Sequence, residues 1–364
     1  MGDAAPAIAT SSEVDPGLVF LGEAERAFER AHERAGGHLD AIEIAGVRVD
    51  LAFAGEAMRA ALLPPLEHLA CGDRGEAAIR ISVFDSASTG VGAPDLPWRP
   101  PRVEPGKSPV ARYETEECCL LASAATGSLA AVDFRRGTAV FHLDDTAALP
   151  ANERAAQLRE TLHLLLSRHD RWLTHAGAVG RDGRGALVVG RGGSGKSTLC
   201  LGSARAGMEI AADDYVALEP AAAGPVAHAL LSTVKLTEES AALLGIGPDL
   251  VAPGEFVVSS ERVAKAEVPV ERLAPGRIRT SLEIVALVAP KIAGLRKPRL
   301  ERISGARGLR SLAPSTVMQT RTRGPSALPA LARLARAVPC YELELSTDVG
   351  ANAEAVARVV GGDA

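Results

Sequence analysis

The feature that most constrains the fold of this chain is a glycine-rich stretch near its middle. Residues 186–198 read Ala-Leu-Val-Val-Gly-Arg-Gly-Gly-Ser-Gly-Lys-Ser-Thr, so Gly190–Ser197 fit the pattern G-x-x-x-x-G-K-[ST]. An apolar run precedes the pattern and a helical stretch follows it, which is the strand–loop–helix context in which such a loop binds phosphate. A glycine-rich turn that binds nothing is the plain alternative, and the agreement of strand, loop and helix argues against it.

Each residue type in this loop has a physical role. The glycines let consecutive backbone N–H groups turn inward around phosphate oxygens, and the following helix adds its positive N-terminal end. We expect Lys196 to contact the β- and γ-phosphates and the Ser197 hydroxyl to ligate Mg²⁺. The expected ligands are ATP and Mg²⁺, and the expected binding residues are Gly190, Arg191, Gly192, Gly193, Ser194, Gly195, Lys196, Ser197 and Thr198.

A pair of aspartates follows the loop at a suggestive distance. Asp214 lies 18 positions after Lys196, and only one short helix and one strand fit between them. In a parallel βαβ unit the pair Asp213-Asp214 should therefore return to the mouth of the loop. One carboxylate there can hold Mg²⁺, and the other can take a proton from an attacking hydroxyl. A pair that only ends a strand and caps a turn is the alternative.

Composition limits the kind of partner. Hydrophobic residues make up 47% and charged residues 23%, which is the balance of a globular protein, and the net charge is −5. Because no Lys/Arg run covers a face and no apolar run reaches about 18 residues, we expect neither nucleic acid nor a membrane as a partner. Five cysteines without CxxC pairs indicate reduced thiols and a cytoplasmic location.

The pattern of apolar residues predicts four regions: a disordered tail at 1–17, an α+β domain at 18–150, a connecting helix at 151–171 and a P-loop domain at 172–364. In the first domain we expect strands at Val47–Phe53, Ala77–Phe84, Cys119–Ala122, Leu129–Phe134 and Thr138–Leu143, the last three in a small antiparallel sheet, and a helix at Glu56–Leu63. The connecting helix is expected over Asn152–Asp170, since leucines recur on one face. In the P-loop domain we expect strands at Ala176–Val179, Ala186–Val189, Met208–Ala212, Ile284–Val288 and Tyr341–Leu345, and helices at Ser197–Ala206, Ala327–Ala337 and Asn352–Val360.

The order of three motifs resembles a known family. His175 lies 21 positions before Lys196, and the loop is followed by Arg205-Ala-Gly-Met-Glu-Ile-Ala-Ala-Asp-Asp214. This arrangement resembles the catalytic domain of HPr kinase/phosphorylase, whose fold is shared distantly with phosphoenolpyruvate carboxykinase. The resemblance covers roughly Trp172–Val288. It implies an α/β fold, a P-loop kinase domain of HPr kinase type with a mixed sheet, preceded here by a smaller α+β N-terminal domain.

The resemblance also implies roles for residues of this chain. Asp214 would accept the proton of the substrate hydroxyl, with Asp213 nearer the metal beside Ser197, and His175 would lie beside the active site. For the family's catalytic arginine the candidates are Arg262 and Arg277, and Arg277 is favoured because Pro275-Gly-Arg277 resembles a turn before a late strand of the family. A histidine that only makes structural hydrogen bonds is the alternative for His175.

The chain departs from the family at one metal ligand. The family's Glu-Ile-Arg-Gly segment is missing, and Leu231-Ser-Thr-Val-Lys-Leu236 stands at its expected place. The loss of that carboxylate argues against reverse phosphorolysis and leaves the metal to Ser197 and an aspartate. Lys235 could contact phosphate instead, or simply point to solvent.

These observations predict an ATP- and Mg²⁺-dependent serine kinase acting on a hydroxyl of a peptide or protein, with a small-molecule hydroxyl as second choice. The segment around Val338–Leu343 is similar to diverged relatives described as serine kinases, some of which act in the biosynthesis of ribosomally made peptides. A P-loop ATPase or nucleotide-dependent switch, and a catalytically weak nucleotide-binding partner protein, stay open as alternatives. Whether the chain forms a homo-oligomer also stays open. The sequence holds no LSGGQ-like and no NKxD-like segment, which argues against transporter ATPases and GTPases.

Overall fold

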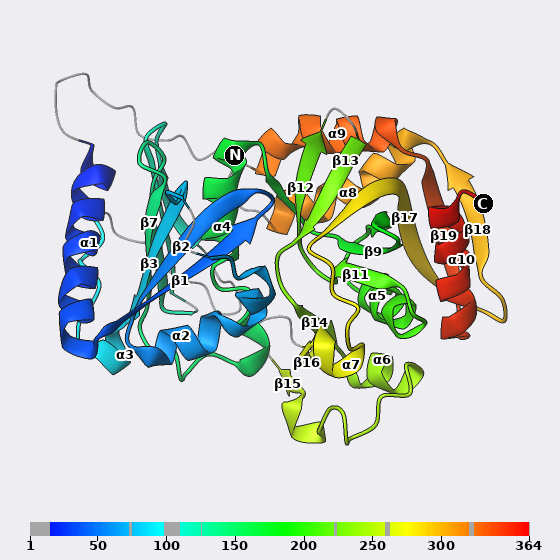
Figure 1. Ribbon diagram of the computed structural model, residues 1–364, viewed down its shortest axis with the longest axis horizontal. Coiled ribbons are helices and arrows are strands. Elements are labelled where there is room, and N and C mark those ends of the chain that lie inside the picture. The colour runs from blue at the N-terminus through cyan, green and yellow to red at the C-terminus, as the bar shows by residue number, and fades with distance from the viewer. Residues whose placement is uncertain are drawn as a thin grey trace, which may run out of the picture.

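The computed structural model describes residues 15–72, 75–97, 110–124, 126–221, 224–258, 263–319 and 324–363. Most of the expected disordered tail therefore lies outside the described residues. Two lobes lie side by side, each built on its own sheet, and helix α4 (Arg159–Leu166) lies between them (Figure 1). None of the helices in these ranges combines the length and apolarity that a bilayer crossing needs.

The first lobe is a mixed seven-stranded sheet in the order β1-β2-β3-β7-β6-β5-β4. Its strands are β1 (Gly37–Ile44), β2 (Val47–Ala54), β3 (Ile79–Asp85), β4 (Val110–Glu114), β5 (Cys118–Ser123), β6 (Ser128–Asp133) and β7 (Thr138–Leu143). Its helices are α1 (Pro16–Ala35), α2 (Glu56–Leu62), the 3-10 helix η1 (Pro64–Leu69) and α3 (Ser86–Thr89). The antiparallel pairing of β5, β6 and β7 confirms that part of the prediction, but these strands belong to a larger sheet in which β3 pairs β2 and β7 in parallel.

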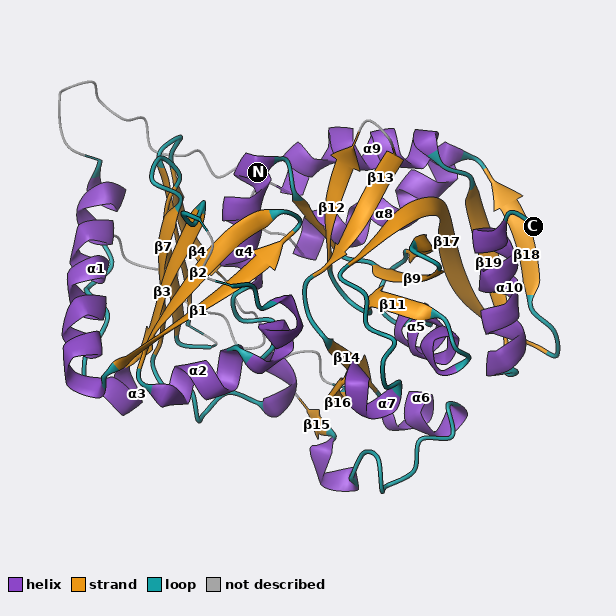
Figure 2. Ribbon diagram, viewed as in Figure 1, coloured by secondary structure: helices purple, strands orange, loops and turns teal. Residues whose placement is uncertain are grey.

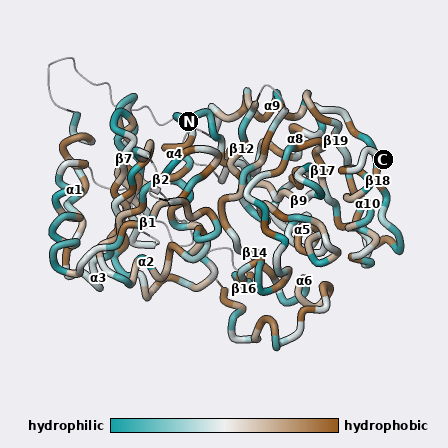
Figure 3. The backbone as a smooth tube through the Cα atoms, in the orientation of Figure 1, coloured by the Kyte–Doolittle hydropathy of each residue, from teal (hydrophilic) through white to brown (hydrophobic). Residues whose placement is uncertain are grey.

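Helix α1 was missed by the sequence analysis, and its first residues correct the predicted tail. Asp15 caps the helix by accepting a hydrogen bond from the Gly17 N–H at 2.8 Å, and Pro16 occupies the first turn. The residues buried against the sheet are Phe20, Leu21, Ala24, Ala27 and Ala31. In Figure 3 the colour of the α1 tube changes repeatedly between hydrophilic and hydrophobic along the helix. With Gly17, six residues of α1 are buried, and three of them are alanines, which give only a weak apolar signal in the sequence.

The predicted twenty-residue connecting helix is wrong. Only α4 is α-helical, and it is flanked by the 3-10 turns η2 (Ala151–Glu153) and η3 (Ser167–His169). Before α4, the backbone of Ala155 bonds the carboxylate of Glu267, so this segment follows a tertiary partner rather than helical bonding. After α4, Asp170 adopts a left-handed conformation that ends the helical run. Leucine spacing alone could not reveal these competing contacts.

The second lobe is a nine-stranded mixed sheet. Its strands are β8 (Trp172–Thr174), β9 (Gly177–Arg181), β10 (Arg184–Val188), β11 (Glu209–Ala212), β12 (Val216–Ala221), β13 (Gly224–Ala229), β17 (Ser281–Leu295), β18 (Arg299–Ile303) and β19 (Cys340–Ser346). A separate small sheet holds β14 (Thr233–Leu236), β15 (Val257–Val258) and β16 (Ala264–Pro269). All five strands predicted for this half of the chain are present, with ends that differ by a few residues, and β17 is far longer than expected.

The connection through the glycine-rich loop is parallel, as predicted, but not between neighbouring strands. Strands β10 and β11 both pair with β9 in antiparallel fashion, so they run in the same direction on either side of it. The two ends that carry the loop and the aspartates therefore lie at the same edge of the sheet. Helix α5 (Lys196–Arg205) makes the connection.

Helices cover both faces of this sheet (Figure 2). One face packs on α8 (Gly305–Gln319) and α9 (Leu328–Ala337), and the other on α5 and α10 (Val349–Gly361). Two short helices, α6 (Glu238–Leu243) and α7 (Val270–Leu273), lie with the small sheet below. One cluster of buried side chains includes residues of α8, of α9 and of the first lobe, so a shared apolar core joins the two sheets, beside a further cluster in each lobe.

Strand β19, the last strand among the described residues, closes against the glycine-rich loop. A Cβ atom at Gly195 would lie 2.5 Å from Cδ1 of Leu345, which is on β19. Gly195 also has a φ of 94°, a conformation that side chains disfavour. The positive φ is the stronger reason for glycine at this position, since the end of the leucine side chain could shift to admit a Cβ atom. In the same way, Gly202 on α5 leaves space for Val349 of α10.

Candidate active site

The loop Gly190–Ser197 has the backbone of a phosphate cradle. Gly190, Gly193 and Gly195 have positive φ angles of 148°, 77° and 94°, which turn successive N–H groups toward the interior of the loop. Gly195 is the N-cap of α5, and Leu199 N–H donates to its carbonyl at 2.9 Å. The loop thus ends at the positive end of a ten-residue helix, where anions bind.

Lys196 fills the loop from within. Its side chain is buried, with the residue 7% exposed, and Nζ donates to the carbonyl oxygens of Gly190 at 2.7 Å and Arg191 at 3.3 Å. Burial lowers the pKa of Lys196, and the charges of Asp214 and Asp213 oppose that shift. An ammonium group held by two neutral carbonyls is free to exchange them for phosphate oxygens, which offer full opposite charge.

Asp213 is the more buried of the two aspartates, with 1% exposed. Oδ2 accepts from the backbone N–H of Lys235 at 3.2 Å, and the carboxylate also takes a hydrogen bond from the Ser197 hydroxyl. Burial and the neighbouring Asp214 raise the pKa of Asp213 to about 7. Its Oδ1 finds no hydrogen-bond partner among the described residues, although it is buried.

Asp214 faces the other way and pairs with His175. The distance from His175 Nε2 to Asp214 Oδ1 is 2.8 Å, and 30% of the aspartate side chain is exposed. Burial raises the pKa of Asp214, but the hydrogen bond and charge of His175, together with Lys235 and Arg159, outweigh it and hold the pKa well below its ordinary value. His175 itself is 6% exposed, and its backbone N–H donates to Thr316 on α8.

Arg159 is a member of this group that sequence reasoning missed. Nη1 donates to the hydroxyl of Tyr215 at 3.2 Å, and Cζ lies 4.9 Å from the centre of the tyrosine ring. Tyr215 also packs on His175, with ring centroids 5.3 Å apart. No motif around α4 marks this arginine, which comes from 37 positions before the lysine of the loop. Only the packing of α4 against the second lobe reveals it.

Strands β14 and β16 complete the surroundings of the aspartates. For Lys235 the sequence allowed either a phosphate contact or a side chain in solvent. In the structure its charge is close enough to Asp214 to lower the pKa of that aspartate. Opposite it on β16 is Glu267, which accepts from the Thr233 hydroxyl at 2.9 Å and whose pKa is raised by burial. Its Oε2 has no hydrogen-bond partner in the part of the chain that the structure describes. No sequence motif marks Glu267 as a member of this group.

Arg277 is not brought together with these residues. Its Nη1 donates to the Gly207 carbonyl at 3.0 Å, and its own carbonyl accepts from Ile210 at the start of β11. Asp213 follows the other end of that strand, so the prediction that Arg277 serves catalysis is not supported by its position. The Pro-Gly-Arg turn is a local pattern, whereas pairing with β11 decides where the turn lies. Arg262 lies outside the described residues.

The other loop residues divide by exposure. Arg191, Gly192 and Gly193 are exposed, and Ser194 has a buried hydroxyl without a partner among the described residues. The Thr198 hydroxyl donates to Ser240 on α6 at 3.1 Å, so it supports the loop from below.

The donors around Asp213 suit a magnesium ion that phosphate oxygens would help to hold. Asp213 Oδ1 is a buried oxygen that finds no partner in the described parts of the chain, and the Ser197 hydroxyl bonds the same carboxylate. Hard oxygen ligands of this kind are those Mg²⁺ prefers. The described residues contain no cluster of three or more His, Cys, Asp or Glu side chains set to hold a metal alone. A metal here would accordingly depend on the nucleotide for its remaining ligands.

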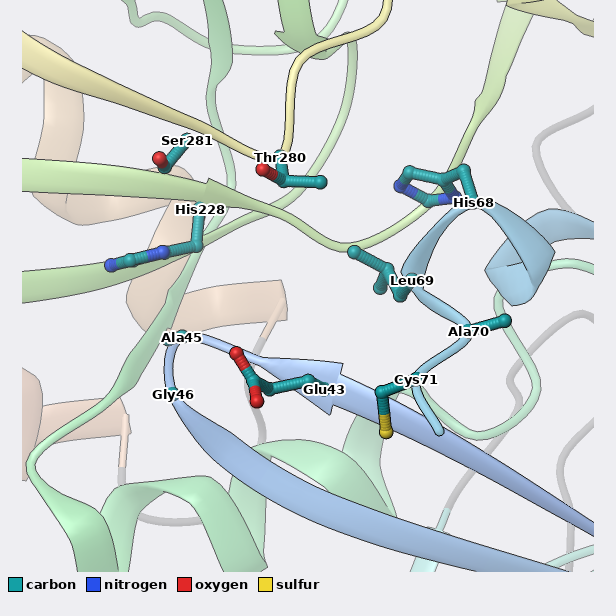
Figure 4. A pocket seen from close by; sticks show the side chains of 10 residues that line it. All are labelled: Glu43, Ala45, Gly46, His68, Leu69, Ala70, Cys71, His228, Thr280 and Ser281. Carbon is teal, nitrogen blue, oxygen red and sulfur yellow. The ribbon is translucent and has the colours of Figure 1, made fainter. Parts of the chain in front are cut away.

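A separate cavity of about 350 Å³ lies between the lobes (Figure 4). Its lining includes Glu43 beside the β1–β2 turn, His68 on η1, His228 on β13 and Ser281 at the start of β17. Strand β10, which leads into the glycine-rich loop, runs parallel to β17, so the start of β17 lies at the sheet edge opposite the loop. This cavity is not part of the candidate active site.

No family model and no curated protein sequence matches the chain. Among solved structures, the HPr(Ser) kinase/phosphatase from Coxiella burnetii is similar at 14% sequence identity, over 48% of this chain and 79% of that one, with a TM-score of 0.26.

Proposed function

We propose that this protein is an ATP- and Mg²⁺-dependent phosphotransferase that moves the γ-phosphoryl group to a hydroxyl of a peptide or protein. The observation that carries the proposal is the meeting of the loop Gly190–Ser197 with Asp213 and with the His175–Asp214 pair at one sheet edge. The loop would supply phosphate contacts, Asp213 a metal ligand, and the His175–Asp214 pair an acceptor for a proton.

The roles follow from the contacts. Lys196 and the loop N–H groups would bind the β- and γ-phosphates, and Ser197 with Asp213 would hold Mg²⁺, which when bound neutralises charge between those phosphates. Asp214, exposed enough to meet a substrate, would accept the hydrogen bond of the attacking hydroxyl. His175 positions Asp214 through its 2.8 Å contact.

In the transfer, the acceptor oxygen forms a bond to the γ-phosphorus while the bond from that phosphorus to the β–γ bridging oxygen breaks. The proton of the hydroxyl passes to Asp214, and ADP leaves with the electron pair. Because the transferred group is loosely bonded to both oxygens at the transition state, the proton can move late, and a weakly basic carboxylate suffices to orient the hydroxyl.

The direct test is incubation with γ-labelled ATP, Mg²⁺ and serine-containing peptides, including those encoded near its gene. We expect label on the peptide, in an acid-stable ester. Release of free labelled phosphate alone would instead support the ATPase alternative, and absence of nucleotide binding would contradict the proposal altogether.

The pKa of Asp213 predicts how metal use depends on pH. Because burial and Asp214 raise this pKa to about 7, a proton competes with the metal below pH 7 and ceases to compete above it. The Mg²⁺ concentration needed for half-saturation in the presence of ATP should be about tenfold higher at pH 6 than at pH 8. Asp214 stays ionised throughout this range, since its pKa is well below its ordinary value.

The measurement is a Mg²⁺ titration of nucleotide binding at both pH values. Asp213→Asn is the matched control, because the amide has nearly the same shape and does not titrate. Its requirement for Mg²⁺ should be high and nearly independent of pH. Equal half-saturation of the wild-type protein at pH 6 and pH 8 would contradict the assignment of Asp213 as metal ligand.

A further inference from the structure

Arg159 brings a fixed positive charge to the acidic end of the site from outside the loop and its helix. It is the first residue of α4, between the two lobes, and it bonds the hydroxyl of the residue that directly follows Asp214. Through Tyr215 it is packed against His175, and His175 is bonded to Asp214. These four side chains form one contiguous group.

The guanidinium is within electrostatic reach of the group expected to meet the substrate hydroxyl. Its charge is one of those that lower the pKa of Asp214, and Asp214 in turn helps to raise the pKa of Arg159 against the opposing effect of burial. The cation is therefore retained although the side chain is only 25% exposed.

Among the residues that the structure describes, most donors of Arg159 have no hydrogen-bond partner. A guanidinium carries five N–H groups, and Tyr215 accepts from one of them. Glu160 Oε1 lies 3.7 Å from Nη2, which is too long for a good hydrogen bond, and the buried Nε has no partner among the residues that the structure describes. A buried donor without a partner is costly, and a ligand that accepts from it removes that cost.

A phosphoryl group is the ligand that fits these donors. Its oxygens are anionic and match the planar fork of a guanidinium, and arginine is the residue that supplies such contacts in phosphoryl transfer. The alternative is that Arg159 only braces the lobes. Arg171 provides the comparison, because it does brace them: Nε donates to the Ala45 carbonyl of the first lobe at 3.0 Å, and Nη2 pairs with Glu219 of the second at 2.8 Å.

We propose that Arg159 is the catalytic arginine of this protein and contacts the γ-phosphoryl group of bound ATP during transfer. The proposal rests on the phosphotransferase function proposed above. It makes the segment between the lobes, rather than the turn at Arg277, the source of the arginine of the site. Lys196 then approaches the γ-phosphate from the loop and Arg159 from α4.

The test compares two nucleotides that differ only by the γ-phosphate, so it needs no acceptor substrate. Affinities for Mg²⁺–ADP and for Mg²⁺ with the non-hydrolysable ATP analogue AMPPNP are measured by calorimetry in wild type, Arg159→Ala, Arg159→Lys and Arg171→Ala. In Arg159→Ala we expect AMPPNP affinity to fall about 10- to 100-fold, the range for loss of a charge-assisted hydrogen bond, and ADP affinity to change less than about twofold.

The other two variants distinguish the charge and planar shape of the Arg159 side chain from a purely structural contact between the lobes. Arg159→Lys keeps the charge but loses the fork and should recover part of the AMPPNP affinity, whereas Arg171→Ala should leave the ratio of the two affinities unchanged. Unchanged ADP binding also shows that Arg159→Ala is folded. If the ratio of AMPPNP affinity to ADP affinity in Arg159→Ala equals that of wild type, this inference is overturned while the proposed function stands. Failure of the wild-type protein to bind either nucleotide would overturn both.

Discussion

Replacing Lys196 with alanine is expected to weaken Mg²⁺–ATP binding by about 10- to 100-fold and to abolish turnover. The lysine nitrogen is held by the carbonyls of Gly190 and Arg191, two residues of the loop. Without it, the charge that develops on the transferring phosphoryl group loses its closest partner.

The same change should leave the unfolding temperature of the nucleotide-free protein nearly unaltered. Burial of the ammonium lowers the pKa of Lys196, so two hydrogen bonds to neutral carbonyls offset a desolvation cost that alanine does not have. Calorimetric titration with ATP and a thermal melt of the free protein measure both quantities. Lys297→Ala, at an exposed lysine after β17, is the matched control. Equal nucleotide affinity in Lys196→Ala and wild type would contradict the assignment of Gly190–Ser197 as the nucleotide-binding loop.

The largest effect on transfer without loss of nucleotide binding is expected from Asp214→Asn. The amide keeps the shape of the side chain but cannot receive the proton, and removal of a group in that role typically costs about 10²–10⁴-fold in rate. Mg²⁺–ATP affinity should survive, because Asp214 is turned toward His175 rather than toward Ser197.

Asp213→Asn shows which of the two aspartates is the metal ligand and which is the proton acceptor. Its pKa of about 7 would by itself make Asp213 the better proton acceptor, yet its bonds to Ser197 and the Lys235 backbone hold it at the metal position. We therefore expect Asp213→Asn to raise the Mg²⁺ requirement and Asp214→Asn to lower the rate at saturating Mg²⁺. Transfer to peptide at the wild-type rate in Asp214→Asn would rule it out as the acceptor, and the reverse outcome for the two variants would exchange their roles.

Local signals explain what the sequence could predict. The strands that carry the site are short apolar runs bounded by glycine or aspartate, and the loop pattern is confined to eight consecutive residues, so both can be recognised without knowledge of the fold. The spacing between Lys196 and Asp214 was sufficient to infer that the aspartates return to the loop. It could not show that β9, which precedes both, is inserted between β10 and β11.

The missed features depend on contacts between distant parts of the chain. Arg159 belongs to the site because α4 packs near Tyr215, and Glu267 because β16 pairs with β14. The expected arginine, Arg277, lies in a turn that was recognised correctly as a turn but is attached to the opposite end of β11. Residue type and spacing do not encode such placements, and the alanine-rich face of α1 left even a long helix without a strong signal.

The contact between Gly195 and Leu345 sets an order of events during synthesis. The ribosome makes the loop some 150 residues before β19, which pairs with β17 and closes over Gly195. Since α10 also covers α5, the nucleotide site of a growing chain stays unfinished until β19 and α10 have emerged. A chain cut short before Cys340 would carry every residue of the loop and still lack the surface that shapes it.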